Sequence, residues 1–164
     1  MTAELDPHAG SRVAERLREL RGQGRAALVA YLPVGYPSVE RSIEAARVLT
    51  ENGVDIVELG LPYSDPVMDG SIIQQAAAAS LAAGTRISDT FTAVAEISKL
   101  VPTVVMTYFN PVLRYGVEAF AADLAAAGGS GLITPDLVPD EAGQWLEASA
   151  KHGLFVKGDG FFCR

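Results

Sequence analysis

The sequence VDIVELGLPYSDPVMDG, residues 54–70, contains an almost continuous apolar run followed by a polar loop with two prolines. The run 54–60 predicts a strand buried on both faces of a parallel sheet, because a half-exposed strand would alternate apolar and polar residues. Three more segments have the same character and adjoin a glycine or a proline: AALVAYL at 26–32, PTVVMTYFN at 102–110 and GLITPD at 131–136. The sequence therefore predicts at least four buried strands.

Helical segments precede and separate these strands. Residues 11–21 place Val13, Leu17 and Leu20 at helical spacing, which predicts an amphipathic helix with one buried stripe. Ser38 is a good N-cap for a helix that continues to about Thr50. Further helices are expected near residues 71–83, 88–100, 116–127 and 139–152. Strands that alternate with helices of this length predict right-handed βαβ units, and hence an α/β fold with a parallel sheet.

The length of the chain limits how far this sheet can extend. A closed eight-stranded α/β barrel usually takes about 250 residues. The chain has 164 residues and no break in composition that would divide it, so we expect one domain over residues 1–164 with four or five strands. The fifth strand would begin in LFVKGDGFFCR, residues 154–164, and stop near Gly158. Both edges of such a sheet are open, which makes self-association a reasonable expectation.

Composition and charge exclude several classes of protein. Hydrophobic residues make up 49% of the chain and charged residues 20%, as is typical of a globular protein. The net charge of −7 disfavours nucleic acid as a partner. The N-terminal residues MTAELDPHAG contain no apolar stretch of signal-peptide length, and about 18 uninterrupted apolar residues, as a membrane span requires, occur nowhere. Because Cys163 is the single cysteine and neither His8 nor His152 has a ligand cluster, we expect no disulfide, no metal and a reducing, cytoplasmic location.

Glu58 is a carboxylate inside an apolar strand. Strand alternation places it on the same face as Val54 and Ile56, toward the interior of the sheet or barrel. Burial raises the pKa of a carboxyl group toward neutrality, which suits a general acid or base. The alternative is a structural carboxylate that caps the next helix or pairs with a lysine or arginine, and position alone does not decide between the two.

The loop after this strand contains a second carboxylate, Asp69. Two carboxylates in different environments are a recurrent way to divide acid and base roles. Asp69 also has the position of a cap for the helix that begins near Ser71, so both interpretations stay open. Asp65, between Ser64 and Pro66, is interpreted as a turn residue.

Two glycine- or alanine-rich segments are interpreted as structural. Residues 128–131, GGSG, have the composition of a phosphate-binding loop, but they precede a strand instead of following one and opening a helix. We interpret them as a helix C-cap and a turn on the face away from the chemistry. Ala76–Ala79 are expected to be part of a closely packed helix.

Several segments in order resemble the family of tryptophan synthase alpha subunits. The resemblance runs from about residue 11 to Leu154, and the ending KGDGFFCR within residues 155–164 is an atypical tail that departs from it. The segments that carry the resemblance are VELGLPYSDPVMDG at 57–70, IIQ at 72–74, YLPVGYP at 31–37, MTYFNPVLRYG at 106–116 and GLITPDLVPDEA at 131–142.

The resemblance implies a TIM (β/α)8 barrel, of which this chain would hold the N-terminal part. Members of the family are lyases of tryptophan biosynthesis that cleave indole-3-glycerol phosphate to indole and glyceraldehyde 3-phosphate by a retro-aldol reaction. This subunit needs no cofactor. Indole then passes to a beta subunit that contains PLP, in an alpha2beta2 assembly. The family's phosphate-binding loops follow strands seven and eight, which we do not expect within residues 1–164.

The resemblance also assigns roles to residues. Glu58 would protonate the indole ring carbon and take up the glycerol hydroxyl proton, and Asp69 would accept the indole N–H. Tyr31 and Tyr108 would line the substrate pocket. The residues that match positions of partner contact and loop closure are Pro62, Asp65, Pro66 and Asp136.

Two interpretations of the whole chain follow. In one, the chain is a tryptophan synthase alpha chain in descent and activity, completed by a second copy or by another chain. In the other, it is an inactive truncated or frameshifted fragment with an out-of-frame ending at Phe161, Phe162 and Cys163, and it retains at most the ability to bind a beta subunit.

Overall fold

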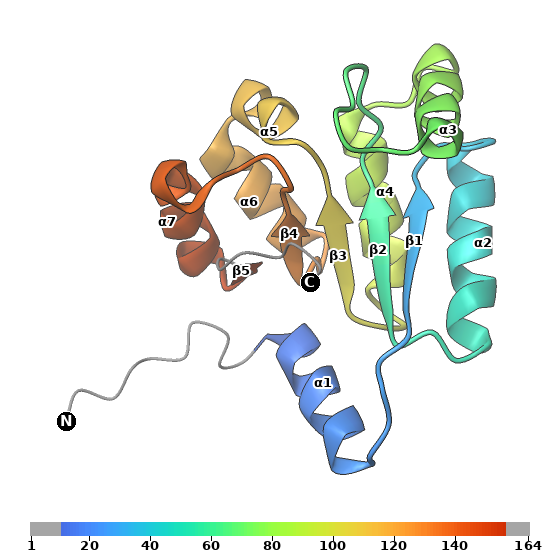
Figure 1. Cartoon of the computed structure of the whole chain (residues 1–164), viewed down its shortest axis with the longest axis vertical. Helices are drawn as coiled ribbons and strands as arrows, with labels where there is room; N and C mark the ends of the chain where they lie inside the picture. The colour runs from blue at the N-terminus through green and yellow to red at the C-terminus, as the bar shows by residue number, and fades with distance from the viewer. Residues whose placement is uncertain (1–10, 157–164) are drawn as a thin grey trace.

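The computed structural model describes residues 11–156 and contains one parallel sheet of five strands. The strands lie side by side in the order in which they occur in the chain (Figure 1). Each strand pairs in parallel with the next. Their bounds are β1 Val29–Pro33, β2 Ile56–Gly60, β3 Thr103–Met106, β4 Gly131–Ile133 and β5 Phe155–Val156.

Helices cover one face and both ends of this sheet. The helices α2, α4, α6 and α7 pack on one face, α1 lies below the N-terminal ends of the strands, and α3 and α5 lie at the C-terminal ends (Figure 1). No helix among residues 11–156 is long and apolar enough to cross a membrane. The helix bounds are α1 Arg12–Gly22, α2 Val39–Glu51, α3 Ser71–Ala82, α4 Ile87–Ile97, α5 Phe109–Tyr115, α6 Val117–Ala126, η1 Pro139–Glu141 and α7 Gly143–His152.

The two faces of the sheet have different neighbours. Val57 and Leu59 of β2 belong to the main core, which the helices cover, together with Val105 and Leu132. The alternate residue Ile56 belongs to a small second cluster with Val104 and with Val13 of α1. Since strand residues alternate between faces, Glu58 lies on the face of Ile56, as the sequence predicts.

The prediction that Val54 shares this face is wrong. Val54 is buried in the helix-covered core. It precedes the first residue of β2, and its N–H donates to the Leu49 carbonyl in the turn that follows α2. Strand alternation therefore does not extend to it.

Asp55 connects α1 to the N-terminal end of the sheet. Its side chain is 1% exposed and accepts hydrogen bonds from Arg16 of α1, from Arg25 and from the N–H of Leu28. Burial alone would raise the pKa of Asp55, but the hydrogen bonds from Arg25, Leu28 and Arg16 lower the pKa to about 2. Asp55 is thus a structural carboxylate, on the opposite end of the sheet from the loop that follows β2.

The helix at the start of the chain buries a narrower stripe than the sequence predicts. Val13 and Leu20 are buried, but Leu17 is 43% exposed. At about 100° per residue, residues 13 and 20 lie within about 20° of each other around a helix, whereas residue 17 is displaced by about 40–60°. Only the side of α1 that carries Val13 and Leu20 packs against the rest of the protein.

Several predicted elements end earlier or are divided. The run 102–110 forms a strand only to Met106, because the chain turns into α5 at Phe109, a helix that the sequence analysis did not predict. The region 139–152 contains a short 3-10 helix and then α7.

The Ser38 cap is confirmed, since its hydroxyl accepts the N–H of Arg41 at 3.2 Å.

The glycine-rich segment 128–131 is a turn, as interpreted from the sequence. Gly128 has a φ of +82°, and the N–H groups of Gly128 and Gly129 donate to carbonyls of the last turn of α6. The segment enters β4 at its N-terminal end, away from the loops that follow the strands. Of the predicted tail at 155–164, Phe155 and Val156 form β5, and the predictions for Phe161, Phe162 and Cys163 concern residues outside those described.

Candidate active site

Glu58 lies near the C-terminal end of β2, on the face that the helices do not cover. It pairs with Tyr31 of β1 and with Val104 of β3. Burial raises the pKa of Glu58. Within residues 11–156, no lysine, arginine or backbone N–H donates a hydrogen bond to its carboxylate. Within residues 11–156, Glu58 therefore neither caps a helix nor forms an ion pair, and it is a partly buried acid without a protein partner in that range.

Asp69 lies in the loop that connects β2 to α3. The N-cap of α3 is Gly70, which has no side-chain cap, and the backbone carbonyl of Asp69 accepts the Gln74 amide at 2.8 Å. The Asp69 side chain is therefore not the helix cap that the sequence allowed. Burial raises the pKa of Asp69, and a hydrogen bond from Tyr108 offsets part of that rise.

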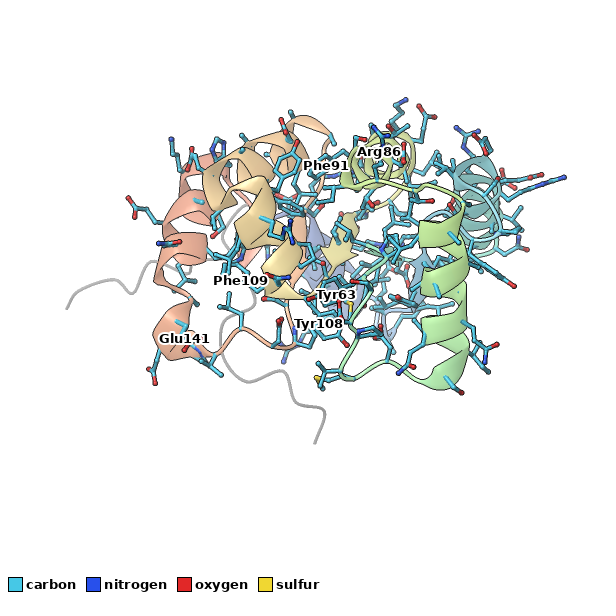
Figure 2. The ribbon with its side chains drawn as sticks, turned by 90° about the horizontal axis from the view of Figure 1, so that it is seen from above. Tyr63, Arg86, Phe91, Tyr108, Phe109 and Glu141 are labelled. Atoms are coloured by element: carbon cyan, nitrogen blue, oxygen red, sulfur yellow. The ribbon has the colours of Figure 1, made fainter. Side chains whose placement is uncertain are left out.

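Tyr108 connects the end of β3 to this loop. It is 3% exposed, and its hydroxyl oxygen accepts the N–H of Val67 at 3.0 Å and that of Met68 at 2.8 Å. Its ring lies 5.3 Å from the ring of Tyr63, tilted by 35°, and Figure 2 shows the two side chains next to each other. The loop is thereby attached to β3 as well as to β2.

Tyr31 extends from β1 across β2. A Cβ built on Gly60 would lie 2.2 Å from the Tyr31 hydroxyl oxygen, so the ring lies directly over Gly60. Burial, followed by the negative charges of Asp69 and Glu58, raises the pKa of Tyr31 to about 12. Both carboxylates are therefore close to the Tyr31 hydroxyl. The structure thus brings Tyr31, Glu58 and Asp69 together.

Replacing Gly60 with alanine is expected to displace Tyr31 without unfolding the chain. The new methyl group would overlap the end of the Tyr31 ring, which faces the uncovered side of the sheet and can swing outward. The pKa of Tyr31 should then fall from about 12 toward the ordinary value of 10.0, since the phenol leaves the carboxylates and gains contact with water. A titration of the near-ultraviolet tyrosinate absorbance measures this change.

The control for that titration is Gly143→Ala, which no atom would crowd and which is not among the glycines with a positive φ. An unchanged Tyr31 titration in Gly60→Ala would contradict the close packing of the ring on Gly60. Gly60 was missed in the sequence analysis, although a glycine within a strand is a known signal of close approach by another group.

The four remaining predicted residues lie on the loops around this site. Pro62 is buried, and Asp65 is exposed in a bend where it accepts the Ser64 hydroxyl, as expected of a turn residue. Pro66 lines an open hollow of about 500 Å³ between this loop and α3. The carboxylate of Asp136 accepts the N–H of Phe109 at 3.0 Å with each oxygen. Asp136 is thus bound to the residue that follows Tyr108.

Comparison with known proteins gives consistent results. A profile of the family described as "Tryptophan synthase alpha chain" matches residues 17–156. The tryptophan synthase alpha chain of Mycobacterium marinum is 58% identical over 151 residues, which are 92% of this chain and 56% of that protein. That of Leifsonia xyli is 56% identical over 146 residues, 88% of this chain and 56% of that protein. The chain thus spans somewhat more than half the length of these curated relatives.

Solved structures show the same relationship. Tryptophan synthase from Mycobacterium tuberculosis has a TM-score of 0.86 and 58% identity, covering 88% of this chain and 56% of that one. The alpha subunit from Legionella pneumophila has a TM-score of 0.85 at 33% identity, again over 88% of this chain and 56% of that one. The parallel sheet with its alternating helices is therefore part of a TIM barrel, and the chain belongs to the tryptophan synthase alpha chain family.

Proposed function

We propose that the chain acts as a tryptophan synthase alpha subunit, a lyase that cleaves indole-3-glycerol phosphate to indole and glyceraldehyde 3-phosphate. The observation that carries this proposal is the pair of carboxylates, Glu58 and Asp69, at the C-terminal ends of the strands. Burial raises the pKa of each, and neither serves as a helix cap or forms an ion pair within the described residues. Reactive groups in parallel α/β folds lie at this end of the strands.

Glu58 would act as both acid and base. Its raised pKa lets it keep a proton at higher pH than an exposed glutamate does, and it gives this proton to the indole ring carbon that carries the glycerol chain. The resulting carboxylate takes the proton from the adjacent glycerol hydroxyl. As the O–H bond breaks, a carbonyl forms, the carbon–carbon bond to the ring breaks, and its electron pair returns to the ring. Glu58 ends the reaction protonated, and no cofactor in this chain is needed.

Asp69 would stabilise the charge that develops on the ring. Protonation of the ring carbon makes the indole nitrogen positive, and a carboxylate that accepts the indole N–H favours this state. The Tyr31 ring would pack against the indole, since it lies beside both carboxylates. Tyr108 is buried behind the loop and would form the wall of the pocket on the β3 side.

The loop after β2 would also face the PLP-containing beta subunit of an alpha2beta2 assembly. Pro62, Asp65 and Pro66 belong to this loop. Three large apolar side chains stand exposed on the loop and on the first turn of α3, namely Val67, Met68 and Ile72, at 82%, 56% and 79%. Exposed apolar groups that gather in one place are typical of a protein interface. Asp136 would take part in closing the site, through its bond to the N–H of Phe109.

The test is the release of indole from indole-3-glycerol phosphate by the purified chain, alone and with a beta subunit from the same source. We expect indole in at least the second case, with glyceraldehyde 3-phosphate in equal amount. The beta subunit alone is the control. A folded chain that releases no indole under either condition would overturn the proposal.

A further inference from the structure

In the loop that carries Asp69, the backbone N–H groups of Val67 and Met68 are held by one side-chain atom. Val67 and Met68 are 82% and 56% exposed, so packing does not fix them. Their N–H groups nevertheless both donate to the hydroxyl oxygen of Tyr108, at 3.0 and 2.8 Å. These bonds join positions 41 and 40 residues apart in the chain.

Two of the three hydrogen-bonding positions of this hydroxyl are taken by consecutive residues of the loop. A tyrosine hydroxyl has one donor and can accept two hydrogen bonds. The N–H groups of Val67 and Met68 occupy both acceptor positions, so the O–H is left to donate. A hydrogen bond from Tyr108 to the Asp69 carboxylate is what lowers the pKa of Asp69 against the effect of burial. The hydroxyl therefore binds the backbone of residues 67 and 68 and acts on the carboxylate of residue 69.

Tyr108 is itself held firmly enough to serve as an anchor. Its side chain is 3% exposed and packs against Tyr63. The next residue, Phe109, is bound through its N–H by Asp136 at the end of β4, and Val112 in the following helix is fully buried. The position of the hydroxyl is thus set by β3, α5 and Asp136, and the loop takes its position from the hydroxyl.

We propose that Tyr108 is a positioning residue whose hydroxyl holds the backbone of residues 67 and 68 and thereby orients the Asp69 carboxylate, the next residue, toward the indole nitrogen. Its effect on catalysis rests on the proposed function, but its effect on the loop does not. The hydroxyl acts through Asp69, and the ring is the support that keeps the hydroxyl in place.

Tyr108→Phe tests this proposal, because phenylalanine keeps the ring and removes only the hydroxyl. The amide hydrogens of Val67 and Met68 should exchange with solvent about tenfold faster in the variant. The pKa of Asp69, followed by NMR of its labelled carboxyl carbon, should rise further above its ordinary value. Tyr63→Phe is the matched control, since it changes the neighbouring ring in the same way and loses only the bond from the Asn110 amide.

A second measurement needs no variant. In the unmodified chain, the amides of Val67 and Met68 should exchange more slowly than that of Asp65 in the same loop. Equal exchange of these three amides in the unmodified chain, or unchanged exchange and an unchanged Asp69 pKa in a folded Tyr108→Phe chain, would overturn the proposal.

The assay of indole release separates this proposal from the proposed function. If the chain is active, Tyr108→Phe should lower kcat by about ten- to hundredfold with a smaller change in KM, because orientation of Asp69 matters most in the transition state. An equal loss in Tyr63→Phe would contradict a specific role of the Tyr108 hydroxyl. If the unmodified chain is inactive, the proposed function fails, while amide exchange and the Asp69 pKa still decide the inference about Tyr108.

Discussion

Replacing Glu58 with glutamine is expected to slow indole release by about a hundredfold to ten-thousandfold, the usual contribution of a general acid or base. Glutamine has nearly the same shape but neither gives nor takes a proton at this position. The loss should appear in kcat, with little change in KM, because the packing of Tyr31 over Gly60 is not altered. Steady-state kinetics with indole-3-glycerol phosphate measure both constants.

The same substitution should stabilise the fold at neutral pH. Burial raises the pKa of Glu58 above 4.5, so the folded chain favours the neutral acid and loses stability as pH rises from about that value through the raised pKa. Glutamine cannot ionise and removes this loss. Thermal unfolding measures this effect at one pH below 4.5 and at one pH above the raised pKa of Glu58. Glu58→Gln should have a higher Tm than the unmodified chain only at the higher pH.

Glu147→Gln is the control for Glu58→Gln, because Glu147 is exposed on α7. It should change neither the kinetics nor the pH dependence of Tm. A Glu58→Gln chain that releases indole at the original rate would remove Glu58 from the mechanism. A lower Tm at neutral pH in that variant would mean that the carboxylate is structurally required.

Replacing Asp55 with alanine is expected to lower the free energy of unfolding by about 3 kcal/mol, the lower end of the cost of breaking a buried ion pair, since Arg16 and Arg25 are partly exposed. The alanine would leave the Leu28 N–H without its acceptor and both guanidinium groups without their shared partner. Denaturant unfolding followed by circular dichroism measures the change.

Acid should produce part of the same effect in the unmodified chain. The pKa of Asp55 falls from 3.8 to about 2 on folding, so its contribution is complete above pH 3.8 and is lost as pH falls through about 2. At 1.36 kcal/mol per pKa unit the contribution is about 2 kcal/mol. Glu19→Ala is the control, because it removes only an exposed pair with Arg16. Equal losses in the two variants would contradict the central role of Asp55.

The sequence predicted what local patterns determine. The apolar runs predicted where the strands lie in the chain, and their alternation with helices predicted a parallel sheet. Ser38 predicted the start of α2. These signals all lie in residues close together in the chain. Glu58 was recognised because a carboxylate in an apolar run is unusual. Its interpretation remained open until the structure showed no ion pair with it in the described region.

What the sequence could not show depends on contacts between distant residues. Asp69 does not cap α3, whose N-cap is Gly70, and the hydroxyl that lowers the pKa of Asp69 belongs to Tyr108, which follows another strand. The helix α5 was missed because residues 102–110 have the composition of one strand, while the N–H of Phe109 is bound by Asp136 after β4. No local signal in either segment predicts that bond.

The order of the strands in the sheet also has a consequence for folding. Because every strand pairs with the one that follows it in the chain, each pairing closes only the segment between two consecutive strands, and the sheet can grow in the direction of synthesis at the ribosome. The largest loop to be closed is the one from β2 to β3, which contains both α3 and α4. That closure also brings Tyr108 to the loop of Asp69, so the pairing step with the largest loop-closure entropy is the one that completes the site.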